Sequence, residues 1–220
     1  NLSTRRGRKE TRDYVYLASV VADRSAETAF LHFVQHRAEL LAMLEDKRVF
    51  DALLESPALL DVSSWFYFYV LTRHSLMRSS LDDRVLAEYL GSILAERISV
   101  DPAQALKGIP AGFVHTVDFL GVLDAATGNT RYEILVAAGN QFLILTGLYP
   151  EFLRSRCEKG AAPDLEFYES FAQRSFRSAA SNKMGPSGAT RSLFGSLADA
   201  IPTARRSLNR VAEEFVFLGD

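Results

Sequence analysis

The stretch from residue 80 to residue 99, SLDDRVLAEYLGSILAERIS, decides the fold class of this chain. Ser80 followed by Asp83 resembles a helix-capping box, with Asp in the place of the usual Glu. Downstream of it, apolar residues recur at the spacing of a single helix face: Val85, Leu86, Tyr89, Leu90, Ile93 and Leu94. The pattern predicts an amphipathic helix that starts just after Ser80.

Helical spacing extends to both sides of this stretch. The block from Trp65 to Leu71 is rich in aromatic residues, which favour sheets, but its length and its helical neighbours indicate a buried helix. No Asn-Gly or Asp-Gly pair marks a hairpin. The predicted helices span residues 10–22, 26–45, 47–55, 59–79, 112–126, 130–146, 164–180, 190–200 and 203–218, with shorter ones after Pro102 and Pro150. We therefore expect an all-α bundle of about eight to ten helices without a substantial sheet.

The chain shows no long linker and no internal repeat, so we expect residues 13–220 to form a single all-α domain. Residues 1–12 carry five cations against one acid, Glu10, and are expected to form a basic N-terminal arm. With 220 residues, 48% of them hydrophobic, the chain is long enough to bury a sizeable core. The net charge of -2 excludes a whole-chain field of one sign.

Cysteine usage and hydropathy predict a soluble cytoplasmic protein. Cys157 is the sole cysteine and cannot form an internal disulfide, which is typical of a reducing compartment. No apolar stretch of the signal-peptide kind follows the basic start. The longest uncharged run, residues 134–150, contains Gly139, Asn140 and Gln141 and is interpreted as a buried central helix rather than a membrane span.

The four histidines supply the first site candidates. His32 and His36 are four residues apart, so they share a helix face and form a weak candidate pair of metal ligands. The residues between them lack the Glu of a zinc-protease motif, and we favour a solvated helix face as the explanation of the pair. No cofactor is expected.

A second set of candidates consists of His115, Asp118, Glu133 and Asn140. Asp118 lies three residues after His115, a spacing at which a carboxylate can orient an imidazole for general-base catalysis or form an ordinary pair on a helix surface. Glu133 and Asn140 are seven residues apart and nearly eclipsed on one helix face. They either line a polar pocket, with His115 nearby, or form a hydrogen-bond network that fixes helix packing.

Positively charged residues are distributed unevenly along the sequence. Arg73 and His74 follow the aromatic block, where they either put positive charge beside an apolar pocket or, as we favour, mark a helix end whose charges reach water. Residues 173–210 hold seven cations against one acid, Asp199. Together with the N-terminal arm, this segment is an alternative nucleic-acid-binding surface.

No motif combines a nucleophile, a base and an electrostatic stabiliser at a workable spacing. We therefore expect a binding or protein-interaction module, with a homodimer among its possible states and a protein among its possible partners. The alternatives are a helical enzyme or metal protein built on the candidates above, and a nucleic-acid-binding protein that uses its basic segments.

Overall fold

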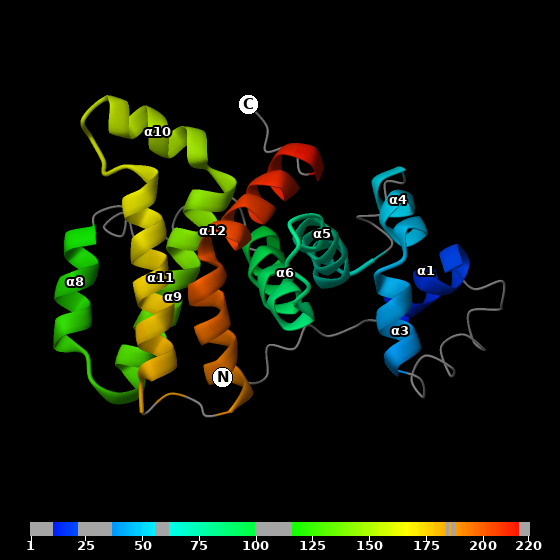
Figure 1. Ribbon diagram of the computed structural model, residues 1–220, viewed down its shortest axis with the longest axis horizontal. Coiled ribbons are helices and arrows are strands. Elements are labelled where there is room, and N and C mark those ends of the chain that lie inside the picture. The colour runs from blue at the N-terminus through cyan, green and yellow to red at the C-terminus, as the bar shows by residue number, and fades with distance from the viewer. Residues whose placement is uncertain are drawn as a thin grey trace. The chain divides into compact units, whose positions relative to one another are not determined.

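In the computed structural model (Figure 1), the described residues are 11–21, 37–55, 62–99, 116–183, 185 and 188–215. They form helices and no strand, so the all-α prediction is confirmed for this part of the chain. The helices are α1 (Thr11–Val21), α3 (Arg37–Leu44), α4 (Lys47–Glu55), α5 (Ser64–Arg78), α6 (Arg84–Ser99), α8 (Thr116–Ala125), α9 (Gly128–Leu148), α10 (Pro150–Glu158), α11 (Leu165–Ser181) and α12 (Ala189–Phe215).

The chain divides into two compact units, Asn1–Val100 and Asp101–Asp220. We call them unit 1 and unit 2 and describe each by itself. A single domain over residues 13–220 stays a prediction. The basic arm of residues 1–12 lies almost entirely outside the described residues, since only its last two residues fall in α1.

Unit 1 is organised around α5, which confirms that the aromatic block is a buried helix. Every side chain from Trp65 to Leu76 is buried. α6 packs closely against α5 because Gly91 has no side chain: a Cβ there would lie 2.9 Å from the Cα of Tyr69. α5 starts at the N-cap Ser63, whose hydroxyl accepts a hydrogen bond from Phe66 N at 3.1 Å.

α1 secures this helix start from a distant part of the sequence. Asp13 is 1% exposed, and its carboxylate accepts hydrogen bonds from the backbone N of Ser63 at 2.6 Å and from its hydroxyl at 2.8 Å. A buried carboxylate at a helix N-terminus is stabilised by the helix dipole and by these donors. The contact ties α1 to α5 across fifty residues of sequence.

The predicted capping box at Ser80 is wrong, because the end of α5 already uses that residue. Ser80 has a φ of 57°, in the left-handed region, and Leu81 N donates back to Leu76 O at 3.0 Å. This is the bond that closes a Schellman helix end. α6 is capped instead by Asp83, whose Oδ1 accepts from Val85 N and Leu86 N at 2.9 and 3.0 Å.

Unit 2 is built on α9, which packs against α11 and α12 (Figure 1). Two glycines of α9 allow close approach. An added Cβ at Gly139 would lie 2.7 Å from the Phe176 ring, and one at Gly147 would lie 2.7 Å from Leu208 Cβ. Gly147 therefore packs inside the helix and does not cap it, as α9 continues to Leu148.

The sequence predicts two helices over residues 190–218, but α12 runs without a break from Ala189 to Phe215, through Pro202. A proline lacks the N–H that would bond the carbonyl four residues earlier, here that of Ala198. Gln173 of α11 replaces the missing donor, since its Nε2 donates to Ala198 O at 3.0 Å. The prediction of a break is therefore wrong because a neighbouring helix supplies the hydrogen bond.

None of the helices in the described part of the chain is both long enough and apolar enough to cross a bilayer.

Candidate functional site

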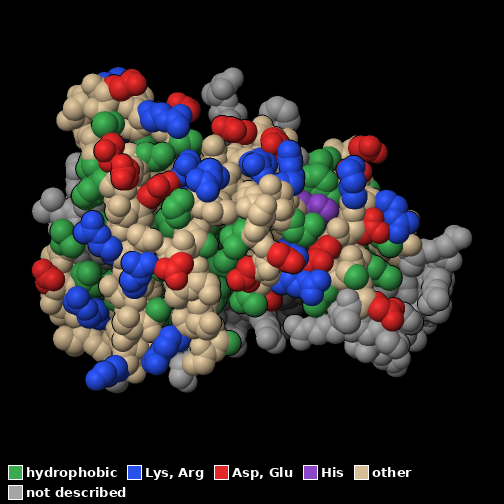
Figure 2. Space-filling view, in the orientation of Figure 1, with side chains coloured by type: hydrophobic (Ala, Val, Ile, Leu, Met, Phe, Trp, Pro, Cys, Tyr) green, Lys and Arg blue, Asp and Glu red, His purple; other side chains and the backbone are tan. Residues whose placement is uncertain are grey.

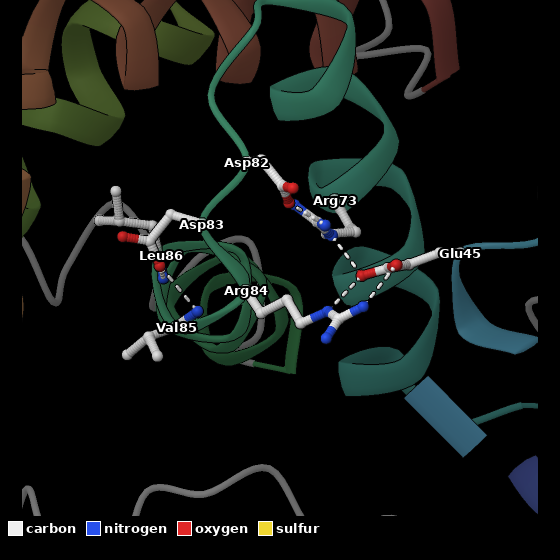
Figure 3. Close-up of polar contacts among 7 residues, drawn as sticks. All are labelled: Glu45, Arg73, Asp82, Asp83, Arg84, Val85 and Leu86. Atoms are coloured by element: carbon white, nitrogen blue, oxygen red, sulfur yellow. Dashed lines mark hydrogen bonds and ion pairs between the residues drawn. The ribbon is translucent and has the colours of Figure 1, made fainter. Parts of the chain in front are cut away.

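Four charged residues meet in unit 1, where α5 faces the α3–α4 turn and the start of α6 (Figure 3). We call Glu45, Arg73, Asp82 and Arg84 the charged cluster. Arg73 Nε donates to Glu45 Oε1 at 2.8 Å, and its Nη2 forms an ion pair with Asp82. Arg84 holds the same carboxylate through Nε at 2.6 Å and Nη2 at 2.8 Å. Glu45 therefore bridges two guanidinium groups.

The burial of these groups differs widely. The Arg73 side chain is 2% exposed and that of Glu45 17%, whereas Asp82 is 82% exposed. The hydrogen bond from Arg84, joined by that from Arg73, outweighs burial and lowers the pKa of Glu45 from 4.5 to about 2. Glu45 is thus ionised at neutral pH. The two positive charges are balanced by two negative charges, so the cluster has no net charge. It joins three segments of unit 1.

Beside this cluster, α5 carries buried polar atoms without a hydrogen-bond partner among the described residues: Tyr69 OH, Thr72 Oγ1 and Arg73 Nη1. Burial, together with the nearby charge of Glu45, raises the pKa of Tyr69 to about 12, so its phenol stays protonated. Leaving such a group unpaired costs about 1–3 kcal/mol. The interior of unit 1 is therefore polar as well as aromatic along α5.

Arg73 and His74 do not reach water as a helix end, contrary to the favoured sequence interpretation. Arg73 is buried because its charge is met by Glu45 and Asp82. His74 is 9% exposed and stacks on Phe50 of α4, with ring centroids 4.4 Å apart. Burial, and then the nearby Arg73, lowers the pKa of His74, so its imidazole is neutral at pH 7.

Most of the residues predicted as site candidates lie where the structure describes little. His32, His36 and His115 are outside the described residues, and of Asp118 only the backbone, in α8, is described. No proposed role for them is tested. Elsewhere, the described residues contain no group of three or more His, Cys, Asp or Glu placed to hold a metal ion.

Glu133 and Asn140 both lie on α9, but in different surroundings. Glu133 is exposed, and its Oε1 accepts a hydrogen bond from Asn129 Nδ2 at 2.8 Å, one turn earlier on the same helix. Asn140 is half-buried. The carboxylate of Glu133 thus faces water and is not a buried group in need of an interhelical partner. A catalytic role for either residue stays a prediction.

The sequence reasoning missed Glu45, Asp82 and Arg84. One signal was present: Arg73 lies two residues after the apolar and aromatic block of residues 65–71, and a buried guanidinium requires carboxylate partners. Its partners lie 28 residues before it and nine residues after it, so spacing alone does not identify them.

Unit 2 exposes large aromatic side chains at one end. We call Tyr149, Phe152 and Phe167 the aromatic surface; they are 44%, 50% and 40% exposed. The first two lie at the junction of α9 and α10, and Phe167 lies in the first turn of α11. Phe142 near the end of α9 stacks on Tyr168 at 5.6 Å, so the end of α9 and the start of α11 lie together.

α10 closes the same end of unit 2. The guanidinium of Arg156 lies 5.7 Å from the ring centroid of Phe152, within the range of a cation–π contact. Burial raises the pKa of Tyr168, and the charge of Arg156 partly opposes that shift, which places Arg156 near the start of α11. The aromatic surface therefore combines exposed rings with an arginine.

Comparison of the chain with protein-family models, with curated protein sequences and with solved structures found no match.

Proposed function

We propose that this protein is a helical protein-interaction module that associates with a second copy of itself through the aromatic surface. The exposure of Tyr149, Phe152 and Phe167 at one end of a closely packed unit carries the proposal. Aromatic residues and arginine are enriched in protein interfaces, where large rings supply most of the binding energy. Exposed singly, such residues need no explanation; gathered at one end, they favour a binding surface.

The charges of α10 favour a second copy as the partner. A two-fold interface brings the same surface together from both copies, so that surface must complement itself. α10 and its cap carry both signs within nine residues, with Glu151 at one end and Lys159 at the other. An antiparallel pairing of two α10 helices about Ser155 brings Glu151 of each copy opposite Lys159 of the other. Phe152 then lies inside the interface.

Sedimentation equilibrium of the full chain tests this proposal. We expect reversible dimers with a dissociation constant between about 1 and 100 μM, as for an interface of modest size. Phe152→Asp is expected to weaken the dimer at least tenfold, since it places a charge in the interface core. An acid in the first turn of α10 suits the helix dipole, so the variant is expected to fold.

Val85→Asp is the matched control. Val85 is 55% exposed and lies in the first turn of α6 in unit 1, so the substitution adds the same charge and removes apolar area at a residue that is not part of the aromatic surface. We expect it to leave the dimer unchanged. A wild-type chain that stays monomeric throughout this concentration range, or an equal loss in both variants, contradicts the proposal.

A further inference from the structure

Unit 2 carries an excess of cations on α11, on α12 and in the turn that follows α11. We call Arg174, Arg177, Lys183 and Arg191 the basic face; all four are exposed. Residues 170–198 contain these four cations and no Asp or Glu. Arg177 pairs with Asp199 at 2.7 Å. The other three have no hydrogen-bond or ion-pair partner among the described residues.

The fold brings these cations together from two antiparallel helices. Phe176 of α11 stacks on Phe194 of α12 with centroids 5.7 Å apart, and the Arg177–Asp199 pair crosses between the same helices. In Figure 2, Lys and Arg side chains are spread over the part of the surface where α11 and α12 lie. At 1.5 Å per residue, the stretch of chain from Arg174 to the end of α11 spans about 10 Å. The basic face is therefore an extended patch.

The neighbouring helix does not cancel this charge. Tyr132 of α9 packs against Phe194 at 6.2 Å, so the start of α9 lies beside α12. The residues on either side of it, Arg131 and Glu133, have opposite signs. Arg131 bonds the carbonyl of Leu123, and Glu133 bonds Asn129. α9 thus adds no net charge at this end of unit 2.

We infer that the basic face binds the phosphodiester backbone of nucleic acid, without reading its sequence. Unpaired, exposed cations on α11, in the turn that follows it and at the start of α12 suit a row of phosphates, whose condensed counterions they release. An acidic protein is a poorer fit, because protein interfaces have an apolar or aromatic core. None of the exposed large apolar side chains in the described part of the chain belongs to the basic face. The inference is independent of the proposed self-association.

Fluorescence anisotropy with the full chain tests it, using labelled duplex DNA and single-stranded DNA of about 20 nucleotides as probes. The triple variant Arg174→Gln, Lys183→Gln and Arg191→Gln is expected to bind at least tenfold more weakly at about 50 mM salt, where phosphate contacts dominate. The slope of log K against log salt for duplex DNA is expected to fall by about 2–3, or about 0.9 for each lost contact.

A charge-matched control separates the basic face from a general charge effect. The triple variant Lys47→Gln, Arg48→Gln and Arg78→Gln removes the same net charge from exposed positions in unit 1. We expect it to leave the affinity within about twofold and the salt slope unchanged. An equal loss in the two triple variants overturns the inference.

Asp199→Asn is a second test, in which nucleic-acid binding is expected to become stronger rather than weaker. The substitution removes the acid that pairs with Arg177, so a fourth cation becomes available and binding is expected to tighten about two- to threefold. Polyglutamate is the competing probe. If it binds as tightly as DNA at equal charge, or if the wild type binds neither DNA probe at low salt, nucleic acid is not the partner.

Discussion

The cores of the two units bury polar groups in different ways. In unit 1 the buried polar side chains include two charged ones, Asp13 and Arg73. In unit 2 the buried polar side chains among the described residues are hydroxyls, those of Thr146, Ser175 and Ser207. Thr146 bonds the carbonyls of its own helix, at 2.8 Å to Phe142 and 3.1 Å to Leu143.

This difference shows two routes to a packed helical core. Unit 1 buries ionic groups whose partners come from distant segments, so its helices are joined by directional contacts. Unit 2 contains an ion pair of partly buried side chains, Arg205 and Glu169, which are 16% and 19% exposed. Both units use glycine for close packing, Gly91 in unit 1 and Gly139 and Gly147 in unit 2. Loss of a buried charge is therefore expected to cost most in unit 1, whereas added volume at a packed glycine is expected to be costly in either unit.

The largest expected effect is that of Glu45→Gln in unit 1. The change takes from Arg73, whose side chain is 2% exposed, its less exposed carboxylate partner, and leaving a buried charge without such a partner costs about 3–5 kcal/mol. Urea denaturation of the full chain measures the loss. Asp82→Asn is the control on the same network: Asp82 is 82% exposed, and exposed pairs contribute about 0–1 kcal/mol. Equal losses in the two variants would mean that burial does not set the strength of this contact.

Gly139→Ala tests volume in unit 2. The new methyl group would lie 2.7 Å from the ring of Phe176, which is fully buried and stacked on Phe194. Overpacking of this kind costs about 1–3 kcal/mol, more than the gain in helix propensity of up to about 1 kcal/mol. Thermal unfolding measures the change.

Gly121→Ala on α8 is its matched control. Gly121 is also helical, but nothing lies within 4 Å of the added methyl group. The propensity gain alone is expected there, a stabilisation of about 0.5–1 kcal/mol. The two substitutions are identical in chemistry and expected to be opposite in sign. A loss of stability in Gly121→Ala would contradict this account of close packing.

The smallest effect concerns Gln173 and Pro202. Gln173→Leu is expected to cost about 1 kcal/mol, since the carbonyl of Ala198 loses its donor. In a Pro202→Ala background the new backbone N–H bonds that carbonyl, so the same substitution is expected to cost much less. A double-mutant cycle by urea denaturation measures the coupling, about 1 kcal/mol. Additive losses would show that Gln173 does not compensate for the proline.

Local sequence patterns predicted much of the fold. The predicted helix over residues 47–55 coincides with α4, and the aromatic block is helical as its length indicated. These predictions hold because apolar spacing and helix ends are encoded within one turn or two. The cap at Ser80 failed for a local reason, as the preceding helix end already uses that residue.

Features that depend on distant residues were not predictable in this way. Arg73 looked like a helix end because its partner Glu45 is 28 residues away. The helix break expected at Pro202 does not occur, because Gln173 on another helix supplies the missing hydrogen bond. The exposure of Phe152 depends on how α10 packs, and the sequence pattern does not distinguish a core ring from a surface ring. The candidate histidines His32, His36 and His115 lie outside the described residues.

The contact between Asp13 and Ser63 has a consequence during synthesis of the chain. The two residues are fifty positions apart, and ribosomes add about 5–20 residues per second. The hydrogen-bond donors of Ser63 are therefore synthesised about 3–10 s after the carboxylate of Asp13. Throughout that interval the carboxylate of Asp13 is hydrogen-bonded to water instead. The contact between α1 and α5 therefore forms only after the start of α5 has left the ribosome.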